Sequence, residues 1–250
     1  MTDLGVAVVV EDDEDVRNLV EAVLSQAGFD VHGAASGREG VEVVRSQKAS
    51  VVTLDVGLND IDGFEVLRRI REFSDAYVVM LTGRTDELDT LTALHTGADD
   101  FMTKPFRPRE LRARVAAMMR RPRQESAEGT SPAAGLVRPQ DSVFRHNGLV
   151  LNPHTRSVTL DGVPTSLTRS EFDLLHALLK AVGTVRSKVD LVRVVRGEHY
   201  GADAYISESD ERAVEVHIGN LRRKLREDPL QPRGLQTVRG VGYRLAPAVD

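Results

Sequence analysis

The chain has 250 residues, enough for one large domain or two small domains that each bury a core. It contains no cysteine, which excludes a disulfide scaffold and any metal site with Cys ligands. The chain does not open with a charged segment followed by an apolar run, as a secretory signal peptide would. No apolar stretch approaches the roughly 20 residues of a membrane span, so a cytoplasmic protein without membrane contact is expected. Residues 1–122 contain 15 Lys and Arg against 22 Asp and Glu, whereas residues 123–250 contain 18 against 16. Any nucleic-acid footprint must therefore be local.

The first half alternates short apolar runs with segments of helical spacing. Runs typical of buried parallel strands occupy residues 6–10, 30–34, 51–54, 77–82 and 100–103. Segments with helical periodicity follow at about 16–27, 40–44, 64–73, 87–96 and 108–119. Five strands alternating with five helices favour a doubly wound parallel α/β sheet.

Polar residues stand where four of these strands end. Asp12 follows the first strand, Asp55 the third, Thr82 the fourth and Lys104 the fifth. In the flavodoxin-like order 2-1-3-4-5, the first and third strands flank the point where ligands bind. Glu11, Asp12 and Asp55 are therefore expected to meet in one crevice.

The residue types in this crevice suit phosphoryl chemistry. Carboxylates brought together repel unless a cation lies between them, and an oxygen-rich, partly hydrated site suits Mg²⁺. A hydroxyl and an ammonium group nearby are what phosphoryl oxygens need, and an Asp can itself be the nucleophile that forms an acyl phosphate. Taken singly, the acidic run 11–15 could be helix-terminal charge, Thr82 an ordinary strand end and Lys104 a surface lysine. Together they indicate a site.

The first 122 residues resemble the receiver domain of bacterial response regulators. The matching pieces are Val10-Glu11-Asp12-Asp13, Leu54-Asp55, Asp62-Gly63-Phe64-Glu65, Leu81-Thr82-Gly83-Arg84, Gly97-Ala98-Asp99-Asp100-Phe101 and Thr103-Lys104-Pro105-Phe106. The resemblance implies that Asp55 accepts phosphate from a sensor histidine kinase. It also implies that Glu11, Asp12, Asp55 and the carbonyl of Gly57 hold Mg²⁺.

The same resemblance assigns further roles. Thr82 would bond the phosphoryl group, Lys104 would pair with it, and the Lys104–Pro105 bond would be cis. Phe101 stands where the family has its aromatic switch, although an aromatic in a final strand is also typical of a core. Where the family commonly has Leu-Pro-Gly after the acceptor, this chain has Leu58-Asn59-Asp60. A looser loop and an added charge near the acceptor are expected, with slower or less stable phosphorylation.

Residues 120–142 lose all apolar periodicity. Their small, polar, Pro- and Gly-containing composition is typical of a flexible tether, and the stretch is too long for an ordinary connection within one domain. The predicted division is a receiver domain at 1–122, a linker at 123–142 and a second domain at 143–250.

The second half begins with short apolar segments separated by turn dipeptides. Asn147-Gly148 and Asp161-Gly162 are turn pairs of the hairpin type, which predicts a small antiparallel sheet. Thr168 and Glu171 form a capping box before a buried helical stripe that starts at Phe172. Ser187 and Asp190 repeat that signal before a second helix.

A third helix is predicted over residues 212–226. Its apolar positions Val214, Ile218, Leu221 and Leu225 share one face. Arg212, Val216, Asn220 and Arg223 lie away from that face, with Arg222, Lys224 and Arg226 alongside. A basic helix is commonly a solvated surface, but it also fits a major groove, where Arg and Asn read base edges. With a closing hairpin at 237–244, the three helices indicate an α+β winged helix-turn-helix.

Residues 144–246 resemble the effector domain of the OmpR/PhoB class of response regulators. The match is carried by residues 167–175, 214–218 and 221–225 and by Thr237-Val238-Arg239-Gly240-Val241-Gly242-Tyr243-Arg244. It implies that the helix enters the major groove and the wing touches DNA, with contacts from Arg212, Val216, His217, Asn220, Arg222, Arg223, Lys224, Thr237 and Arg239.

Two departures from the class lie beside this helix. Arg196 replaces the usual Trp at the end of the second helix. The segment 197–211 is longer and more acidic than usual, and relatives use it to touch RNA polymerase or a neighbouring protomer. The mode of activation is therefore left open.

The two resemblances together imply a transcription regulator switched by phosphorylation. Phosphate on Asp55 would draw Thr82 inward and move Phe101, so that receivers pair symmetrically while the effectors bind direct-repeat DNA. The charges available for pairing are Asp99, Asp100, Glu110, Arg112 and Arg114. Thr90 replaces a basic residue usual in the class, so weaker or less phosphate-dependent homodimers are expected.

Three other hypotheses compete with this interpretation. A phosphatase of the haloacid-dehalogenase type also uses a strand-end Asp and Mg²⁺, but it needs a second Asp where this chain has Gly57. A dinucleotide-binding fold needs a Gly-x-Gly-x-x-Gly motif after a strand, and none is present. A regulator that binds DNA without phosphorylation keeps every motif.

Overall fold

Five parallel strands form the sheet of the first lobe, in the predicted order β2-β1-β3-β4-β5. The computed structural model describes residues 4–83, 87–119, 143–196, 206–228 and 232–248, so the predicted linker at 123–142 lies outside the described residues. The strands are β1 (Val6–Val10), β2 (Asp30–Ala34), β3 (Val51–Asp55), β4 (Tyr77–Thr82) and β5 (Asp100–Thr103). Every residue of β3 and β4 is buried, because helices cover both faces of the sheet.

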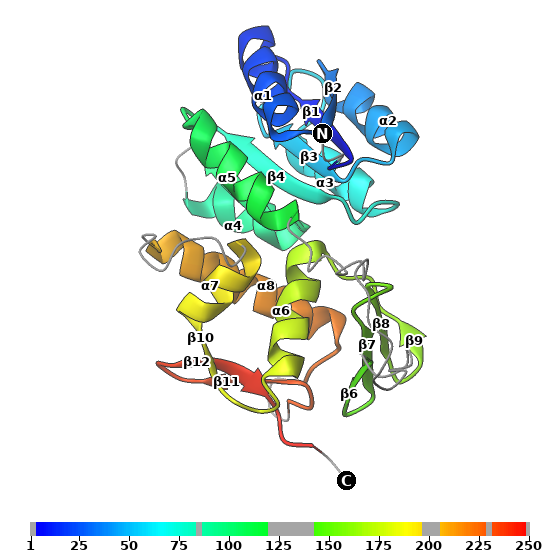
Figure 1. The fold of residues 1–250 in the computed structure, drawn as a ribbon, viewed down its shortest axis with the longest axis vertical. Coiled ribbons are helices and arrows are strands. Elements are labelled where there is room, and N and C mark those ends of the chain that lie inside the picture. The colour runs from blue at the N-terminus through cyan, green and yellow to red at the C-terminus, as the bar shows by residue number, and fades with distance from the viewer. Residues whose placement is uncertain (1–3, 84–86, 120–142, 197–205, 229–231, 249–250) are drawn as a thin grey trace, which may run out of the picture.

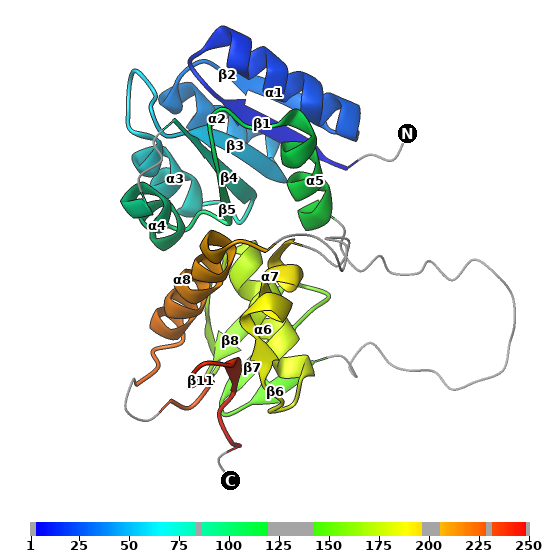
Figure 2. The ribbon, with the colours of Figure 1, turned by 90° about the vertical axis from the view of Figure 1, so that its left-hand side faces the viewer.

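Five helices cover the two faces of this sheet. They are α1 (Glu14–Ala27), α2 (Gly37–Gln47), α3 (Gly63–Arg71), α4 (Glu87–Thr96) and α5 (Pro108–Met119). Helices α1 and α5 lie together on one face, and α2, α3 and α4 lie on the other (Figure 2). Alternate residues of the strands supply a separate apolar core to each face.

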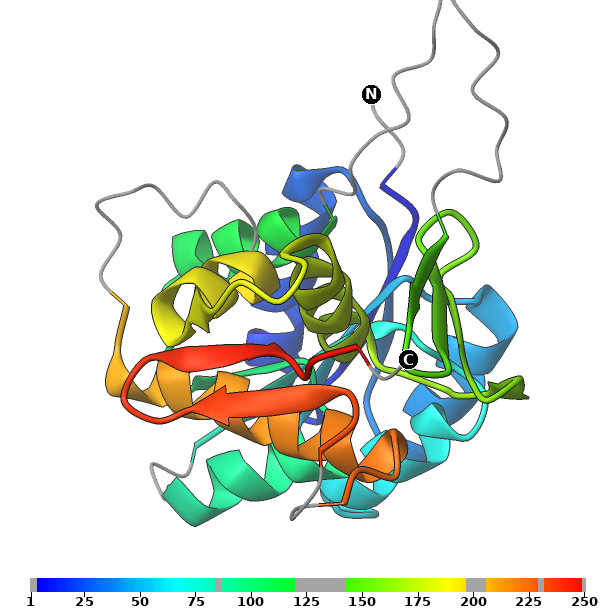
Figure 3. The ribbon, with the colours of Figure 1, turned by 90° about the horizontal axis from the view of Figure 1, so that it is seen from below.

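The second lobe contains three helices between two antiparallel sheets (Figure 1). The first sheet consists of β6 (Phe144–His146), β7 (Leu149–Asn152), β8 (Ser157–Leu160) and β9 (Val163–Pro164). The helices are α6 (Arg169–Lys180), α7 (Lys188–Arg196) and α8 (Glu208–Lys224). A second sheet joins β10 (Arg186–Ser187) to the hairpin of β11 (Leu235–Val238) and β12 (Gly242–Leu245), which lies across α8 when seen from below (Figure 3). This arrangement confirms the predicted winged helix-turn-helix.

Helix α8 begins four residues before the predicted start at residue 212 and ends at Lys224. Ser207 Oγ accepts a hydrogen bond from the amide of Asp210 at 3.3 Å, and Asp210 Oδ2 accepts one from the amide of Ser207 at 2.9 Å. This capping box starts the helix within a stretch that was read as an acidic loop. The start predicted at residue 212 was therefore wrong.

The two lobes are in contact. Helix α8 lies along α4, and α7 approaches the end of α5 (Figure 2). Within the described part of the chain, no helix is both long and apolar enough to cross a membrane.

Candidate functional site

Three carboxylates meet at the carboxyl edge of the first sheet, as predicted. Glu11, Asp12 and Asp55 each offer an oxygen atom within 4.8 Å of the other two. Glu11 and Asp55 are buried and Asp12 is half-buried, because adjacent strands β1 and β3 end at the same level under the helices. Mutual repulsion at this spacing favours a bound cation or an ion-pair partner.

Lys104 supplies such a partner. Its Nζ lies 2.7 Å from Glu11 Oε2 and 2.8 Å from Asp55 Oδ1. The Lys104–Pro105 peptide bond is cis, which confirms the prediction. Burial opposes the positive charge, but the hydrogen bonds that the ammonium group donates to the two carboxylates, with their negative charges, outweigh it and raise the pKa of Lys104.

Burial also acts on Glu11. It raises the pKa of this carboxyl above the ordinary value, and the negative charges of Asp55 and Asp12 add to the rise, while Lys104 opposes it. Protons therefore compete with a cation at Glu11.

Backbone contacts hold the loops that carry these side chains. Arg17 Nη1 donates to the carbonyl oxygens of Glu11 at 2.7 Å and Asp12 at 3.3 Å. The amide of Gly57 donates to Asp55 Oδ2 at 3.1 Å. A Cβ on Gly63 would lie 2.2 Å from the carbonyl oxygen of Asp55, so only glycine allows α3 to start this close to the acceptor. Arg17 was not predicted from the sequence, where its only signal is a basic residue two positions after the acidic run 11–15.

Asp60 has a different role from the one expected. Its two carboxylate oxygens accept hydrogen bonds from the amides of Gly37 at 2.8 Å and Arg38 at 3.1 Å, at the start of α2. Desolvation raises the pKa of Asp60, but the hydrogen bonds from these backbone amides outweigh it, and the pKa is lowered. The residue that replaces the usual glycine therefore ties its loop to a helix N-terminus, where negative charge is favoured.

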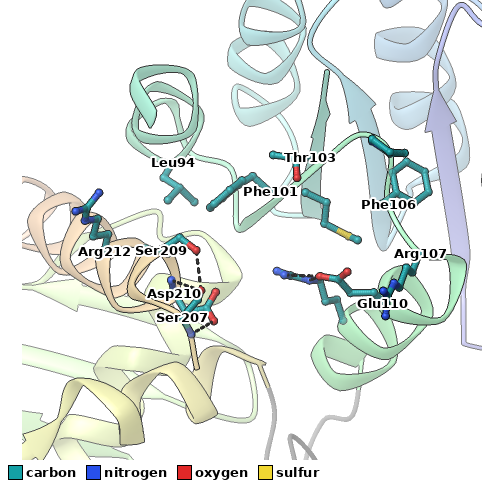
Figure 4. A pocket seen from close by; sticks show the side chains of 14 residues that line it. Leu94, Phe101, Thr103, Phe106, Arg107, Glu110, Ser207, Ser209, Asp210 and Arg212 are labelled. Atoms are coloured by element: carbon teal, nitrogen blue, oxygen red, sulfur yellow. Dashed lines mark hydrogen bonds and ion pairs between the residues drawn. The ribbon is translucent and has the colours of Figure 1, made fainter. Parts of the chain in front are cut away.

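Thr82 and Phe101 lie on the two strands that follow β3 in the sheet, β4 and β5. Thr82 is buried at the end of β4, and its carbonyl accepts a hydrogen bond from the amide of Lys104 at 2.6 Å. Phe101 is partly buried and lines a cavity of about 430 Å³ between the lobes. Figure 4 shows Phe101 and Leu94 on the receiver side of that cavity, facing residues of α8 that include Arg212.

The residues predicted to read DNA divide into two groups. Val216, His217 and Asn220 are 5 %, 1 % and 3 % exposed, although Val216 and Asn220 lie away from the apolar face of the helix. Arg212, Arg223, Thr237 and Arg239 are exposed, and Arg222 and Lys224 are partly buried. Three of the nine residues predicted to contact DNA are therefore buried.

The first lobe covers these three residues. Asn220 Nδ2 donates to the carbonyl of Leu94 at 2.9 Å, and His217 Nε2 lies 3.1 Å from the carbonyl of Asp99. Val216 belongs to the same apolar cluster as the receiver core on the α4 side. Burial, which outweighs the nearby carboxylates, lowers the pKa of His217.

Two of the predicted DNA-binding residues also have partners inside the second lobe. Arg222 Nη2 donates to Thr237 Oγ1 at 2.7 Å and so joins α8 to the wing. Lys224 Nζ lies 2.6 Å from Glu171 Oε2 at the start of α6.

Four of the five residues predicted to pair receivers, Asp99, Asp100, Glu110 and Arg114, form ion pairs within the chain. Arg114 contacts Asp100 at 2.9 Å and Glu110 at 2.8 Å, so Glu110 has a partner without the basic residue that Thr90 replaces. Asp99 is fully buried, and Arg112 is exposed. The pairing role stays a prediction.

Two departures noted in the sequence fall at the junction of α7 and α8. Arg196 is buried and paired with Asp210, the residue that caps α8. The residue that stands where the class usually has Trp is therefore an ion-pair partner in this chain. The segment 197–211, predicted to touch partners, lies outside the described residues up to position 205.

Comparisons with known proteins cover both lobes. Residues 7–116 match the family described as response regulator receiver domain, and residues 162–245 match the family described as transcriptional regulatory protein, C terminal. The chain is 36% identical over 238 residues to transcriptional regulatory protein AfsQ1 of Streptomyces coelicolor. The alignment covers 95% of this chain and 96% of that relative.

Two solved structures align with almost the whole of this chain. A mutant of RitR shares 20% identity at a TM-score of 0.71, covering 97% of this chain and 99% of that one, which supports the fold. The regulator DrrB of Thermotoga maritima, an OmpR/PhoB homologue, shares 28% identity with the same coverage and a TM-score of 0.46.

Proposed function

The chain belongs to the OmpR/PhoB class of response regulators, phosphorylation-regulated transcription factors of two-component systems, and on this premise we propose that Asp55 is the phosphoacceptor. The observation that carries this proposal is the convergence of Glu11, Asp12 and Lys104 on the Asp55 carboxylate. Histidine kinases and DNA are the partners of such a regulator. The transfer forms a bond between an Asp55 oxygen and phosphorus as the phosphorus–nitrogen bond of the kinase phosphohistidine breaks.

Receiver domains bind Mg²⁺ at an acidic pocket, and we assign that role here to Glu11, Asp12 and Asp55, with the carbonyl of Gly57. Three carboxylates within 4.8 Å of one another, two of them buried, are a donor set that a hard divalent cation fits. When bound, the ion would neutralise phosphoryl oxygens as charge develops on them.

The remaining residues of the pocket act on the phosphoryl group. Lys104 already contacts Asp55 Oδ1, so its ammonium group is placed to pair with an oxygen of the attached phosphoryl group. Thr82 ends the neighbouring strand at the same edge and is assigned the hydroxyl that bonds the phosphoryl group. Its movement toward that group would change the surroundings of Phe101, which stands in the adjacent strand.

We propose that α8 enters the major groove and that the wing contacts the backbone or minor groove. The two exposed arginines of α8, Arg212 and Arg223, and the exposed wing residue Arg239 support phosphate contacts, and the amide of Asn220 supports base readout. Homodimers on direct-repeat operators, and contact with RNA polymerase, are inferred from the class. The site of action is then the cytoplasm, where the DNA lies.

Phosphorylation of the full chain by acetyl phosphate tests the proposal. We expect a phosphoryl adduct, measured by intact mass, that requires Mg²⁺ and disappears in Asp55→Asn. The exposed Asp30→Asn provides the matched control and should accept phosphate normally. An adduct that persists in Asp55→Asn would contradict the assignment.

We further propose that the chain is not a turnover enzyme. Gly57 stands where a phosphatase of the haloacid-dehalogenase type needs its second Asp, and its amide contacts Asp55 Oδ2 instead. No hydrolysis of p-nitrophenyl phosphate above the Asp55→Asn background is expected. Comparing the DNA affinity of Asp55→Ala with that of the phosphorylated chain, at one salt concentration, tests regulation that is independent of phosphate.

A further inference from the structure

The loop of residues 56–62, between β3 and α3, carries two groups of the proposed site. The amide of Gly57 donates to Asp55 Oδ2 at 3.1 Å, and the carbonyl of the same residue is assigned to Mg²⁺. Asp62 fixes the far end of the loop, because its side chain accepts from the amide of Phe64 at 2.7 Å and so caps α3. The position of the Gly57 carbonyl then depends on what holds the residues between these two points.

Asp60 holds the middle of the loop against a different element. Its Oδ1 accepts from the amide of Gly37 at 2.8 Å, and its Oδ2 accepts from the amide of Arg38 at 3.1 Å. These are the first two amides of α2, which have no partner within the helix. The third amide, that of Glu39, donates to Ser36 Oγ at 3.3 Å. The negative charge of Asp60 therefore lies at the positive end of the α2 dipole.

The start of α2 is in turn joined to the first strand of the site. The carbonyl of Ala34, which ends β2, accepts from the amide of Glu11 at 3.1 Å. The amide of the next residue, Ala35, donates to the side chain of Glu39 at 2.8 Å. A path of covalent bonds and hydrogen bonds therefore runs from the backbone of Glu11, through the start of α2, to the carboxylate of Asp60.

Side-chain packing makes this contact close. A Cβ on Gly37 would lie 2.6 Å from Val66 Cγ2 and 2.7 Å from Ile61 Cγ1, well inside van der Waals contact. Gly37 is also buried. Only glycine at this position therefore lets the first amide of α2 reach Asp60 while α2 packs against α3.

We propose that Asp60 is a positioning residue for the Mg²⁺ site and for phosphoryl transfer to Asp55, because it ties the loop that carries Gly57 to the start of α2. This rests on the proposed function of Asp55 and adds a residue that determines how well the site is formed before the ion binds. The hydrogen-bonded carboxylate supplies the stiffness that a proline ring would give this loop. Asp60 therefore promotes phosphorylation, in contrast to the slower reaction expected from its charge.

Asp60→Gly in the full chain tests the tether without phosphoryl transfer. The amides of Gly57 and Gly63 are hydrogen-bonded to Asp55 Oδ2 and to the carbonyl of Val56, so their exchange reports on the order of the loop. In the absence of Mg²⁺, we expect both to exchange at least about fivefold faster than in the wild type, measured by NMR. Calorimetry should show Mg²⁺ binding about fivefold more weakly, because binding must then also order the loop. Wild-type values for both would overturn the proposal.

Ser36→Ala separates positioning from a general loss of stability. Ser36 caps the same end of α2, but its hydroxyl bonds the amide of Glu39 within the helix and not the loop. Urea unfolding should show losses of similar size in Ser36→Ala and Asp60→Gly. The affinity for Mg²⁺ should fall only in Asp60→Gly. Equal losses of affinity in the two variants would make Asp60 an ordinary helix cap and overturn the proposal.

Acetyl phosphate kinetics distinguish positioning from charge. If the Asp60 carboxylate acted by repelling the phosphoryl donor, Asp60→Asn would accept phosphate faster than the wild type. We expect it to react about threefold more slowly at limiting Mg²⁺ and to approach the wild-type rate at saturating Mg²⁺, because the ion can still order the loop. Asp15→Asn, which removes an exposed carboxylate in the first turn of α1, controls for the lost charge. Faster acceptance in Asp60→Asn than in Asp15→Asn would overturn the proposal.

The role of Asp60 and the function on which it rests can fail separately. If the wild-type chain forms no phosphoryl adduct, the proposed function fails, while amide exchange and Mg²⁺ calorimetry still decide whether Asp60 positions the loop. If the adduct forms and both of those measurements are unchanged in Asp60→Gly, only the role of Asp60 fails.

Discussion

Two buried aspartates of the receiver lobe lie at opposite ends of the parallel strands. They differ in the groups that bind their carboxylates. Asp55 ends β3 and contacts a single flexible cation, Lys104, which it shares with Glu11. Asp99 precedes β5 and is held by Arg71 together with backbone amides from both lobes.

The difference separates a reactive carboxylate from a structural one. Lys104 is 21 % exposed and is a point charge that can move to a new anion, so Asp55 keeps oxygens available to an incoming phosphoryl group. The oxygens of Asp99 already accept from fixed amides and from a planar guanidinium. Burial alone therefore does not identify a functional carboxylate.

The largest expected effect is on phosphoryl transfer to Asp55. Asp55→Asn should abolish phosphoryl transfer while leaving the lobe folded, because it removes one of three mutually repelling carboxylates. Intact mass after acetyl phosphate treatment measures the loss, and urea unfolding measures the stability. A substantial loss of stability would mean that Asp55 resembles Asp99 after all.

A substitution beside Asp99 should lower stability and leave phosphoryl acceptance unchanged. Arg71→Met keeps the apolar stem but leaves Asp99 buried without its cation, which should destabilise the receiver by about 3 kcal/mol. Arg71 also donates to the carbonyls of Gly97 at 2.8 Å and Ala76 at 2.5 Å, so further bonds are lost.

Hydrogen exchange of amides in β4, measured in urea, checks this prediction locally. Arg38→Met, an exposed arginine of α2, is the matched control and should change little. Phosphoryl acceptance by folded Arg71→Met should persist, because the Asp55 pocket lies at the other end of the strands. Loss of acceptance with full stability would contradict the division between the two carboxylates.

A smaller effect is expected for the cation site. Glu11→Gln should weaken Mg²⁺ binding about tenfold, because one charged ligand becomes neutral while two carboxylates remain. The raised pKa of Glu11 also predicts that acidification weakens Mg²⁺ binding in the wild type and has less effect in Glu11→Gln. Titration calorimetry at several pH values measures both. Asp30→Asn should bind as the wild type does.

The reactive site could be predicted from sequence because its signals are local. Strands β1, β3 and β4 are runs of largely apolar residues, and a polar residue ends or closely follows each of them. Parallel topology then brings Asp12, Asp55, Thr82 and Lys104 to one edge. Arg17, which was not predicted, and the contact of Asp60 with the start of α2 both involve backbone groups whose positions only the folded loops define.

The contact between the lobes could not be predicted in the same way. Val216 and Asn220 are off the apolar stripe of α8, and helical periodicity therefore places them in solvent. They are buried because a second lobe docks on them, and docking through a linker leaves no periodic signal in the sequence. The early start of α8 was missed for a similar reason, since the capping pair Ser207 and Asp210 stands in an acidic stretch.

The smallest expected effect is a pH dependence of the contact between the lobes. Burial lowers the pKa of His217 in the docked state, and Asp99, Asp100 and Glu171 are the charged groups facing it. Among the described residues Nδ1 of His217 has no partner, so a proton added there would gain no hydrogen bond. When the lobes separate, His217 regains its ordinary pKa of about 6.5.

The docked state therefore binds fewer protons than the open state. Its stability should be complete above about pH 6.5 and should fall as pH drops from there toward the lowered pKa.

Thiol labelling measures this pH dependence. The chain contains no cysteine, so Val216→Cys introduces a single thiol at the buried contact and Ser157→Cys introduces one at an exposed site of β8. The rate at which maleimide labels Val216→Cys, divided by that of Ser157→Cys to remove the intrinsic titration of a thiol, should rise by about fivefold or less between about pH 7.5 and about pH 5.5. His217→Gln in the Val216→Cys background should flatten this ratio. A ratio that rises equally in both proteins would assign the pH dependence to the surrounding carboxylates, because they alone would remain to titrate.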